Sequence, residues 1–463
     1  MTTADPAPVR TRDTVPAAPG RRPMTVLVVS QALGGAGMAA GITVGALLAE
    51  DLLGSTGLAG LPAALYTGGA AVGAMTVGRV SQHRGRRPGL ALGHGAAALG
   101  SVGVVAGAAA GWTALLLTAL FVYGAGSVTG LLARYAGADL APPERRGRAT
   151  GTVLLATTLG AVAGPNLVGP TGAVAAAYGL PRLTGPFLLA AVAYTAACLV
   201  LLLWLRPDPM AVARARAAAT GPAPPSDGGA AAKKAATVPG PGQARVATGP
   251  EETDTETDTE TDAGASRTPT GRPGRRRPSG VVTGATVTIS AQLVMIAVMT
   301  MTPVHMAAHG HSTQAAGTVI ALHVGAMFLP SRLSGSLVDR LGAPPVAVAS
   351  GVVLLVAGVL AGLLPPQGFA GPAFALVLLG IGWNLALVSG SAMVTEAAPP
   401  ATAAAVQGQV DVGMSLAGAT GGMVSGLTVA GAGYPLLAVA GGVLAVAVIP
   451  AVALRGGFGR PLT

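Results

Sequence analysis

The feature that most constrains this chain is a succession of twelve apolar runs, each about as long as a membrane-spanning helix. A helix needs about 20 consecutive apolar residues to cross the hydrocarbon core of a bilayer. Charged or proline-rich breaks separate the runs, which cover residues 24–48, 58–80, 89–110, 112–136, 150–175, 184–205, 281–306, 314–338, 345–365, 371–395, 403–430 and 434–454. The sequence therefore predicts an all-α integral membrane protein with twelve transmembrane helices.

Two divisions between these runs depend on a short break that contains glycine. Gly111 separates the third run from the fourth, and Ala432 with Gly433 separates the last two runs. Hydropathy defines these divisions least sharply, because a glycine-rich helix and a glycine-rich turn look alike on that scale. We expect a turn at both places.

Charge is scarce, and its distribution gives the expected orientation. Only 10% of the residues are charged, against about 25% in soluble domains, so the chain cannot cover a water-exposed surface with charge. Of the 28 lysines and arginines, Arg182 alone falls in a loop on the far side. By the positive-inside rule, we expect a multi-pass protein of the bacterial inner (plasma) membrane with both termini in the cytoplasm. The net charge of +10 is then explained by the basic residues that border the cytoplasmic face. A nucleic acid is therefore not expected as a partner.

The break after the sixth run is longer than the others. Residues 206–280 lack apolar periodicity and contain a low-complexity acidic run at 253–262, which is typical of a disordered linker. The predicted organisation is a disordered N-terminal tail, a six-helix bundle, a disordered cytoplasmic linker, a second six-helix bundle and a C-terminal tail, covering residues 1–23, 24–205, 206–280, 281–454 and 455–463.

An internal repeat relates the two halves. A constant offset of 257 residues aligns Gly78 with Gly335, Asp139 with Glu396, and the two prolines at 142–143 with those at 399–400. The register is unbroken over several separate features, so the sequence indicates two homologous six-helix halves. Repeats of the same sense are related by an axis along the membrane normal, with the transport pathway between them. Alternating access follows as the expected mechanism.

The loop after the second run of each half contains a motif of glycines and charged residues. The motif residues are Gly78, Gln82, Gly85, Arg86 and Arg87 in the first copy, and Gly335, Asp339, Arg340 and Gly342 in the second. This loop resembles the corresponding motif of the Major Facilitator Superfamily, and the resemblance covers all twelve runs. It implies that fold, two bundles and secondary transport, generally by a monomer.

The motif is expected to act as a gating latch. Its glycines allow two helices to approach closely, and a carboxylate at the position of Asp339 can accept hydrogen bonds from helix N-terminal amides. In the first copy Gln82 carries no charge, which weakens a charge relay to Arg134 and Asp139 at the end of the fourth run. Ala343 and Pro344 replace the basic pair in the second copy.

The fifth run contains a second motif, which comprises Gly151, Gly160, Gly164, Pro165 and Gly169. It resembles the motif of the drug:proton antiporters within the superfamily, and this resemblance implies export. Closely spaced glycines form a smooth face for helix packing, and a proline inside a helix kinks it. We expect a hinge or a tight seal against the opposite half.

Asp411 is the only acid well inside a predicted span. Ionisable groups are expensive inside a bilayer and are therefore functional candidates. A desolvated carboxylate can bind a proton near neutral pH, which makes Asp411 the candidate for proton coupling. A structural carboxylate that is hydrogen-bonded to a neighbouring helix is the alternative.

Polar side chains within the spans are candidates for contacts with the substrate. They are Gln31, Asn166, Gln292, Trp383, Asn384 and Gln407. Amides also join neighbouring helices in membranes, so this alternative stays open. A zinc site at His309 and His311 is not expected, because no third ligand is placed by the sequence.

No nucleotide-binding loop or hydrolase motif is present, so an enzyme and a cofactor are not expected. The sequence predicts a secondary transporter that exports a small organic molecule, such as a drug or a metabolite, in exchange for protons. Uptake of a nutrient or metabolite on the same fold is the alternative.

We predict that Asp339→Asn impairs transport more than Gln82→Ala. The aspartate is the copy of the latch residue that retains its charge, and a charged acceptor binds helix N-terminal amides more strongly than a neutral one. Transport by each variant, measured in the same membranes as the wild-type protein, checks this prediction. Wild-type transport rates for both variants would contradict the hypothesis that the motif acts as a gating latch.

Overall fold

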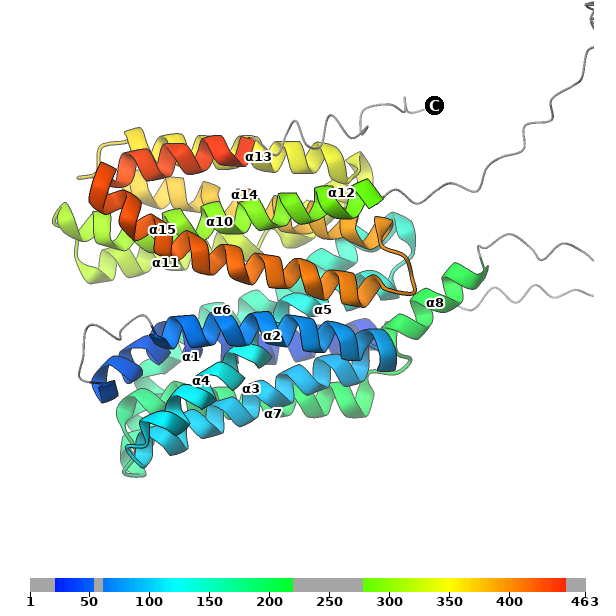
Figure 1. Ribbon diagram of the computed structural model, residues 1–463, viewed down its shortest axis with the longest axis horizontal. Helices are drawn as coiled ribbons and strands as arrows, with labels where there is room; N and C mark the ends of the chain where they lie inside the picture. The colour runs from blue at the N-terminus through cyan, green and yellow to red at the C-terminus, as the bar shows by residue number, and fades with distance from the viewer. Residues whose placement is uncertain (1–20, 54–60, 220–277, 447–463) are drawn as a thin grey trace, which may run out of the picture. The chain divides into compact units, whose positions relative to one another are not determined.

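The chain is described by a computed structural model that covers residues 21–53, 61–219 and 278–446 (Figure 1). Every regular element in these ranges is a helix. The helices are α1 (Arg22–Leu53), α2 (Leu61–Arg84), α3 (Arg86–Ala109), α4 (Thr113–Ser127), α5 (Thr129–Leu140), α6 (Arg146–Ala177), α7 (Gly185–Trp204), α8 (Pro209–Ala219), α10 (Pro278–Ala308), α11 (Thr313–Phe328), α12 (Ser331–Leu341), α13 (Ala343–Leu363), α14 (Ala370–Ala397) and α15 (Ala403–Val446), with 3-10 turns η2 (Pro143–Arg145) and η3 (Arg182–Thr184).

Within the described ranges, eight helical stretches are long and apolar enough to cross a membrane. Their outer surface is apolar as well: Leu99, Val192 and Leu427 are 72%, 69% and 77% exposed. A soluble protein rarely exposes so much contiguous apolar surface. The prediction of an all-α membrane protein is confirmed.

Two of the predicted spans are each built from two helices. The fourth span is broken between α4 and α5, where the Ser127 hydroxyl donates a hydrogen bond of 2.9 Å to the carbonyl of Gly124. A serine side chain that binds such a carbonyl competes with the helical backbone. The eighth span is broken between α11 and α12 at Pro330, because proline has no N–H with which to continue a helix.

The two glycine-containing divisions are turns, as predicted. Gly111 ends the third span with a φ of 63° and Gly433 divides α15 with a φ of 83°. Glycine adopts this left-handed conformation without the steric cost that other residues carry. The eleventh and twelfth spans are therefore the two segments of α15.

The helices form two groups that follow the two halves of the sequence. In the first half α3 packs on α4 and α7, and α1 packs on α6 and α7; in the second half α10 packs on α14 and α15. In Figure 1, α1 to α7 gather in one bundle and α10 to α15 in another. Both bundles belong to one compact unit, and they meet through α2 with α15 and through α6 with α12.

The two contacts between the halves are related by the sequence repeat. A Cβ atom on Gly408 would lie 2.6 Å from the carbonyl oxygen of Ala74, and one on Gly151 would lie 2.0 Å from that of Ser331. Residues 74 and 331, and residues 151 and 408, are each separated by 257 positions. The α2–α15 and α6–α12 interfaces are thus two copies of one interface, as expected for homologous halves.

Glycines also allow close packing within a half. A Cβ atom on Gly73 would lie 1.8 Å from the carbonyl oxygen of Ala125, and one on Gly124 would lie 2.1 Å from that of Tyr66. These positions bring the backbones of α2 and α4 into direct contact. Close backbone approach of this kind stabilises helix pairs in membranes, where apolar burial alone gives little preference for association.

The predicted start of the disordered linker is wrong for its first residues. Within the predicted range 206–280, residues Pro209–Ala219 form α8, in which Pro209 and Met210 are buried, and α10 begins at Pro278. The alanine- and arginine-rich composition of this segment resembles a linker, whereas its side chains make specific contacts with the first half. Residues 220–277 lie outside the described part of the chain.

We predict that Gly73→Leu destabilises the protein while Gly317→Leu does not. A side chain at position 73 must displace the backbone of α4, and overpacking of this kind costs about 1–3 kcal/mol. Gly317, also within a helix, has no neighbouring atom within 4 Å of an added Cβ. Thermal unfolding of the purified variants in detergent checks the difference, and equal melting temperatures would contradict the packing argument.

A candidate gate and proton-coupling site

Among the residues that the structure describes, the hydrogen bonds and the ion pair that join the halves lie at one end of the bundles. We call it the basic end, because exposed arginines gather there in the chain segments around the loop after α2, the start of α6, the end of α12 and α8. These include Arg84, Arg145, Arg214 and Arg340. The motif residues of both halves lie at this end.

Gln82 at the end of α2 bonds to the start of α15 in the opposite half. Its Oε1 accepts a hydrogen bond from the backbone N–H of Ala404 at 2.8 Å, and its Nε2 donates to the carbonyl of Ala401 at 2.6 Å. The first N–H groups of a helix have no partner within the helix. The Gln82 amide therefore caps α15 and joins the halves without a charge.

Asp339 at the end of α12 makes the equivalent contact with the start of α6. Its Oδ1 accepts from the backbone N–H of Gly147 at 2.7 Å, and its Oδ2 accepts from that of Arg148 at 2.9 Å. Position 147 corresponds to 404 at the repeat offset, just as 82 corresponds to 339. Here the cap carries a negative charge at the positive end of the α6 dipole, which stabilises it further.

A buried ion pair lies between the halves, deeper than these two caps. Arg134 of α5 and Asp411 of α15 are joined by an Nη2–Oδ1 distance of 2.7 Å, and their side chains are 0% and 1% exposed. Nη1 of Arg134 also donates to Oδ2 of Asp411 at 3.4 Å. The pair joins the two halves through charges that have no contact with solvent.

The remaining donors of the Arg134 guanidinium are also bonded. Nε donates to the hydroxyl of Ser391 at 2.8 Å, Nη1 to the carbonyl of Leu131 at 2.6 Å, and Nη2 to the hydroxyl of Tyr135 at 2.9 Å. Burying a charge is costly unless it is paired and its hydrogen bonds are satisfied. This environment meets both conditions.

A second buried pair lies beside the first. Nε of Arg86 is 2.8 Å from Oδ2 of Asp139, and Nη2 of Arg86 donates to Oε1 of Gln407 in the opposite half. The guanidinium carbons of Arg86 and Arg134 lie 6.0 and 4.2 Å from the centre of the Tyr135 ring. Arg134 and Asp139, which the sequence suggested as one relay, thus belong to different pairs, and the arginines of both pairs lie near the Tyr135 ring.

The other latch residues have backbone or packing roles. Gly85 and Gly342 end their helices with φ values of 101° and 88°. A Cβ on Gly78 would lie 2.9 Å from the carbonyl oxygen of Ala404. The backbone N–H of Arg87 donates to Asp208, and Arg340 is exposed. Gly335 makes the equivalent contact in the second half, where it packs against Gly147 of α6.

The antiporter-type motif of α6 is described only at its two ends. Gly151 contacts Ser331 of the opposite half, while no atom lies within 4 Å of a Cβ added to Gly169. The environments of Gly160, Gly164 and Pro165 lie outside the described residues. Only the first glycine of the motif is therefore seen to pack against the other half.

Most of the predicted substrate contacts are used between helices instead. The Asn384 amide donates to the Met327 carbonyl and to the Ser331 hydroxyl, both at 2.7 Å, and it accepts from Ser334 at 2.6 Å. It is fully buried and its hydrogen bonds are satisfied by α11 and α12. Gln407 likewise belongs to the Arg86 cluster. Neither amide lines a substrate cavity in this conformation.

Two further candidates bond to each other. The indole N–H of Trp383 donates to Oε1 of Gln292 at 2.7 Å, which links α14 to α10. Gln31 is 1% exposed and neither atom of its amide has a partner. The side chain of Asn166 lies outside the described residues.

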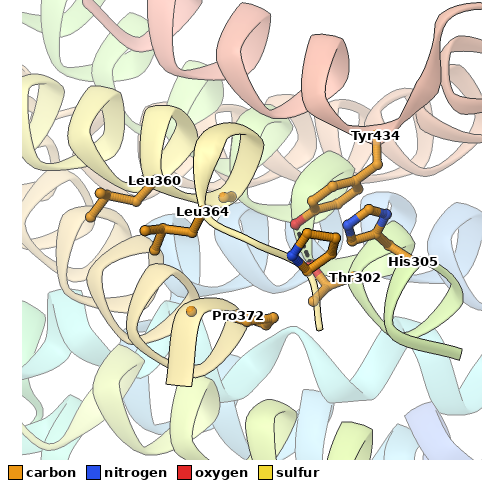
Figure 2. A pocket seen from close by; sticks show the side chains of 9 residues that line it. Thr302, His305, Leu360, Leu364, Pro372 and Tyr434 are labelled. Atoms are coloured by element: carbon orange, nitrogen blue, oxygen red, sulfur yellow. Dashed lines mark hydrogen bonds between the residues drawn. The ribbon is translucent and has the colours of Figure 1, made fainter. Parts of the chain in front are cut away.

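The pocket near the far end of α10 does not form a substrate site. Figure 2 shows that it is lined by Thr302, His305, Leu360 and Tyr434, among others. The hydroxyls of Thr302 and Tyr434 are 2.8 Å apart, and the ring of His305 stacks on Tyr434 with 4.3 Å between centres. Its volume of about 10 Å³ has room for about one water molecule.

A larger space, of about 560 Å³, lies between α10 and α15 near the basic end. Val282 and Leu444 in its lining are 49% and 44% exposed, so it opens on the apolar outer surface of the second half.

No cluster of three or more potential metal ligands occurs among the described residues.

Several residues of the site were not singled out from the sequence. They are Tyr135 and Ser391, which surround Arg134, and Asp208, Arg214 and Arg216 of the segment after α7. One signal existed for Ser391: it lies 257 residues after Arg134, so the two occupy equivalent positions on the fourth helix of each half. Residues near a pseudo-twofold axis meet their own equivalents.

Comparisons with known proteins agree with this architecture. A sequence model of the Major Facilitator Superfamily matches residues 26–422. The chain is 44% identical to the uncharacterized MFS-type transporter YdeG of Bacillus subtilis (strain 168), with 93% of this chain and 91% of that protein covered. It is 29% identical to the riboflavin transporter RfnT of Brucella anthropi, with coverages of 84% and 85%.

The fold is also found among solved structures. The human organic anion transporter MFSD10 superimposes with a TM-score of 0.68 at 16% identity, covering 94% of this chain and 99% of that one. The twelve predicted spans, the repeated halves and the matched sequence lead to one conclusion: the chain belongs to the Major Facilitator Superfamily and is a multi-pass membrane transporter.

Proposed function

We propose that this transporter exports a small organic molecule in exchange for protons, and that it works by alternating access. Membership of the superfamily makes it a carrier and not an enzyme. The proposal adds the direction, the coupling ion and the residues that link them. It also takes the protein to act as a monomer, because one chain supplies both halves of the pathway.

The basic end is proposed to face the cytoplasm. The positive-inside rule places loops rich in arginine on that side of the membrane, and this orientation puts both termini in the cytoplasm of a bacterium. The structure then corresponds to a conformation that is closed toward the cytoplasm, because Gln82, Asp339 and the Arg134–Asp411 pair all join the halves at that end.

The observation that carries the proposal is the buried pair between Arg134 and Asp411. Each partner belongs to a different half, so the cytoplasmic end cannot open while the pair is intact. Removing the charge of one partner of a buried pair destabilises the contact by about 3–5 kcal/mol, because the other charge is left uncompensated. Protonation of Asp411 is a change of this kind. Proton binding therefore favours opening of the cytoplasmic end.

The cycle follows from this contact. A proton that reaches Asp411 from outside neutralises the carboxylate, and Arg134 is released to water as the halves separate at the basic end. Substrate binds from the cytoplasm, Asp411 loses its proton to that side, and the ion pair reforms as the basic end closes. Substrate then leaves on the outer side. The gradient of protons thus drives export.

Export is favoured over uptake by the resemblance of α6 to the antiporter motif. Uptake is the second candidate, because a proton and a substrate that bind together from outside use the same opening at the basic end. The similarity to a riboflavin transporter supports a small organic molecule as cargo in either direction. Gln31 on α1, whose buried amide has no partner, is the remaining candidate for substrate contact among the described amides.

We predict that Asp411→Asn abolishes proton-driven transport while leaving counterflow of substrate without a gradient measurable. The amide cannot take up a proton, yet it occupies the same volume. Transport by reconstituted protein over a range of pH checks this, with Glu144→Gln as a control in which an exposed acid is replaced by its amide. An unchanged pH dependence in Asp411→Asn would make the carboxylate structural.

The direction has its own test. In inverted membrane vesicles with an acidic lumen, an exporter that exchanges protons accumulates its substrate inside. We expect accumulation by the wild-type protein and its loss when a protonophore dissipates the gradient. Failure in this geometry, with accumulation in right-side-out vesicles under an inward proton gradient, would assign uptake.

A further inference from the structure

The segment that follows α7 is attached to the backbone of the gate. The Asp208 carboxylate accepts three backbone hydrogen bonds: from Arg86 at 3.1 Å and Met210 at 2.8 Å through Oδ1, and from Arg87 at 2.8 Å through Oδ2. Arg86 and Arg87 begin α3, and Met210 is in the first turn of α8. One carboxylate therefore caps two helices, with its charge at the positive ends of both dipoles.

The motif glycine of the first half makes room for this carboxylate. A Cβ atom on Gly85 would lie 2.5 Å from Oδ2 of Asp208. The equivalent glycine of the second half, Gly342, has a similar φ but meets only Pro344, at 3.8 Å. The space beside Gly85 thus holds a side chain that has no equivalent in the other half of the described chain.

Two arginines of α8 bind the ends of two other helices. Nη2 of Arg214 donates to the carbonyl of Gln82 at 2.7 Å. The guanidinium of Arg216 donates to the carbonyls of Asp139, Leu140 and Ala141 at 3.0, 2.9 and 3.0 Å. The last carbonyls of a helix have no partners within it, and a cation at that end is favourable. α8 therefore ties the ends of α2 and α5 to the start of α3.

The residues that α8 holds by their backbones are those whose side chains form the gate. Gln82 reaches α15, Arg86 reaches Gln407 of α15, and Asp139 is the ion-pair partner of Arg86. A small shift of these three helix ends would misalign the bonds that Gln82 and Arg86 make to α15. The bonds of Arg214 and Arg216 described above go to residues of the first half, and those residues in turn contact the second half.

We propose that α8 is a positioning element of the gate. Arg214 holds Gln82, Asp208 holds Arg86 and Arg216 holds Asp139 in the arrangement that joins the two halves, and these bonds stabilise the conformation closed at the basic end. The inference rests on the proposed alternating access.

The test measures the separation of the halves at the basic end in the full-length protein. Spin labels are attached to His83→Cys and Thr402→Cys, two exposed positions on either side of the Gln82 contact, in a Cys198→Ser background. Distance distributions are recorded by pulsed electron resonance for this protein and for Asp208→Asn, Asp208→Glu and Arg216→Gln. Glu144→Gln, which removes an exposed acid of the neighbouring turn, is the matched control.

We expect Asp208→Asn and Arg216→Gln to raise the ratio of long to short distances by about fivefold, the effect of losing one helix cap. Asp208→Glu should restore most of the short distance, and Glu144→Gln should leave the distribution unchanged. Thermal unfolding measures the loss of the cap separately: a lower melting temperature together with a wild-type distance distribution would show that Asp208 and Arg216 stabilise their helices without positioning the gate.

Wild-type distributions in both Asp208→Asn and Arg216→Gln would overturn the inference, as would an equal shift in Glu144→Gln. If Asp208→Asn does not fold, Arg216→Gln decides the matter alone. The proposed function fails in a different way: the unlabelled wild-type protein then moves no substrate in the vesicle assays, whatever the distances show.

Discussion

A guanidinium and a carboxylate that are both withdrawn from solvent must remain together, and the rest of this structure depends on that constraint. Arg134 and Asp411 come from different halves and are 0% and 1% exposed. Separating them inside the protein leaves two unpaired charges in a medium of low dielectric constant. The halves can part at the basic end only when water reaches the pair or when a proton neutralises the carboxylate. In the proposed function, the interaction that closes the basic end is thereby sensitive to the proton, which is the proposed coupling ion.

The duplicated architecture places this pair where it can control both halves. The α2–α15 and α6–α12 interfaces are copies of one another, with a glycine in each that lets the backbones touch. They flank the central pair on the two sides of the pathway. The copies differ in charge: Asp339 caps α6 as a carboxylate and Gln82 caps α15 as a neutral amide, while α8 reinforces only the neutral side.

The fold could be predicted from the sequence because each part of it has a local signal. Runs of apolar residues give the spans, and a constant offset between proline and glycine positions gives the two halves. The breaks at Ser127 and Pro330 escaped detection because they do not interrupt hydropathy. α8 was missed for a related reason: its alanines and arginines have the composition of a linker, and its helix depends on contacts of Asp208 and Arg216 with residues more than 70 positions away.

The site was only partly predictable. Asp411 stood out as an acid within a span, but its partner Arg134 lies 277 residues earlier in the sequence, and no local pattern connects them. Asn384 and Gln407 looked like substrate ligands because amides are uncommon in spans, whereas the structure uses both between helices. The sequence indicates that a polar group lies within a span. Only the packing of several helices determines which partner forms a hydrogen bond with that group.

The central claim is that protonation of Asp411 releases the contact between the halves at the basic end. The most direct measurement is the distance between spin labels at positions 83 and 402 as a function of pH, in the wild-type protein and in Asp411→Asn. The account predicts that long distances become more populated as the pH falls in the wild-type protein, and that the distribution in the variant is shifted toward long distances and does not change with pH. A variant that follows the wild-type pH dependence, or a wild-type distance that does not respond to pH, would contradict it.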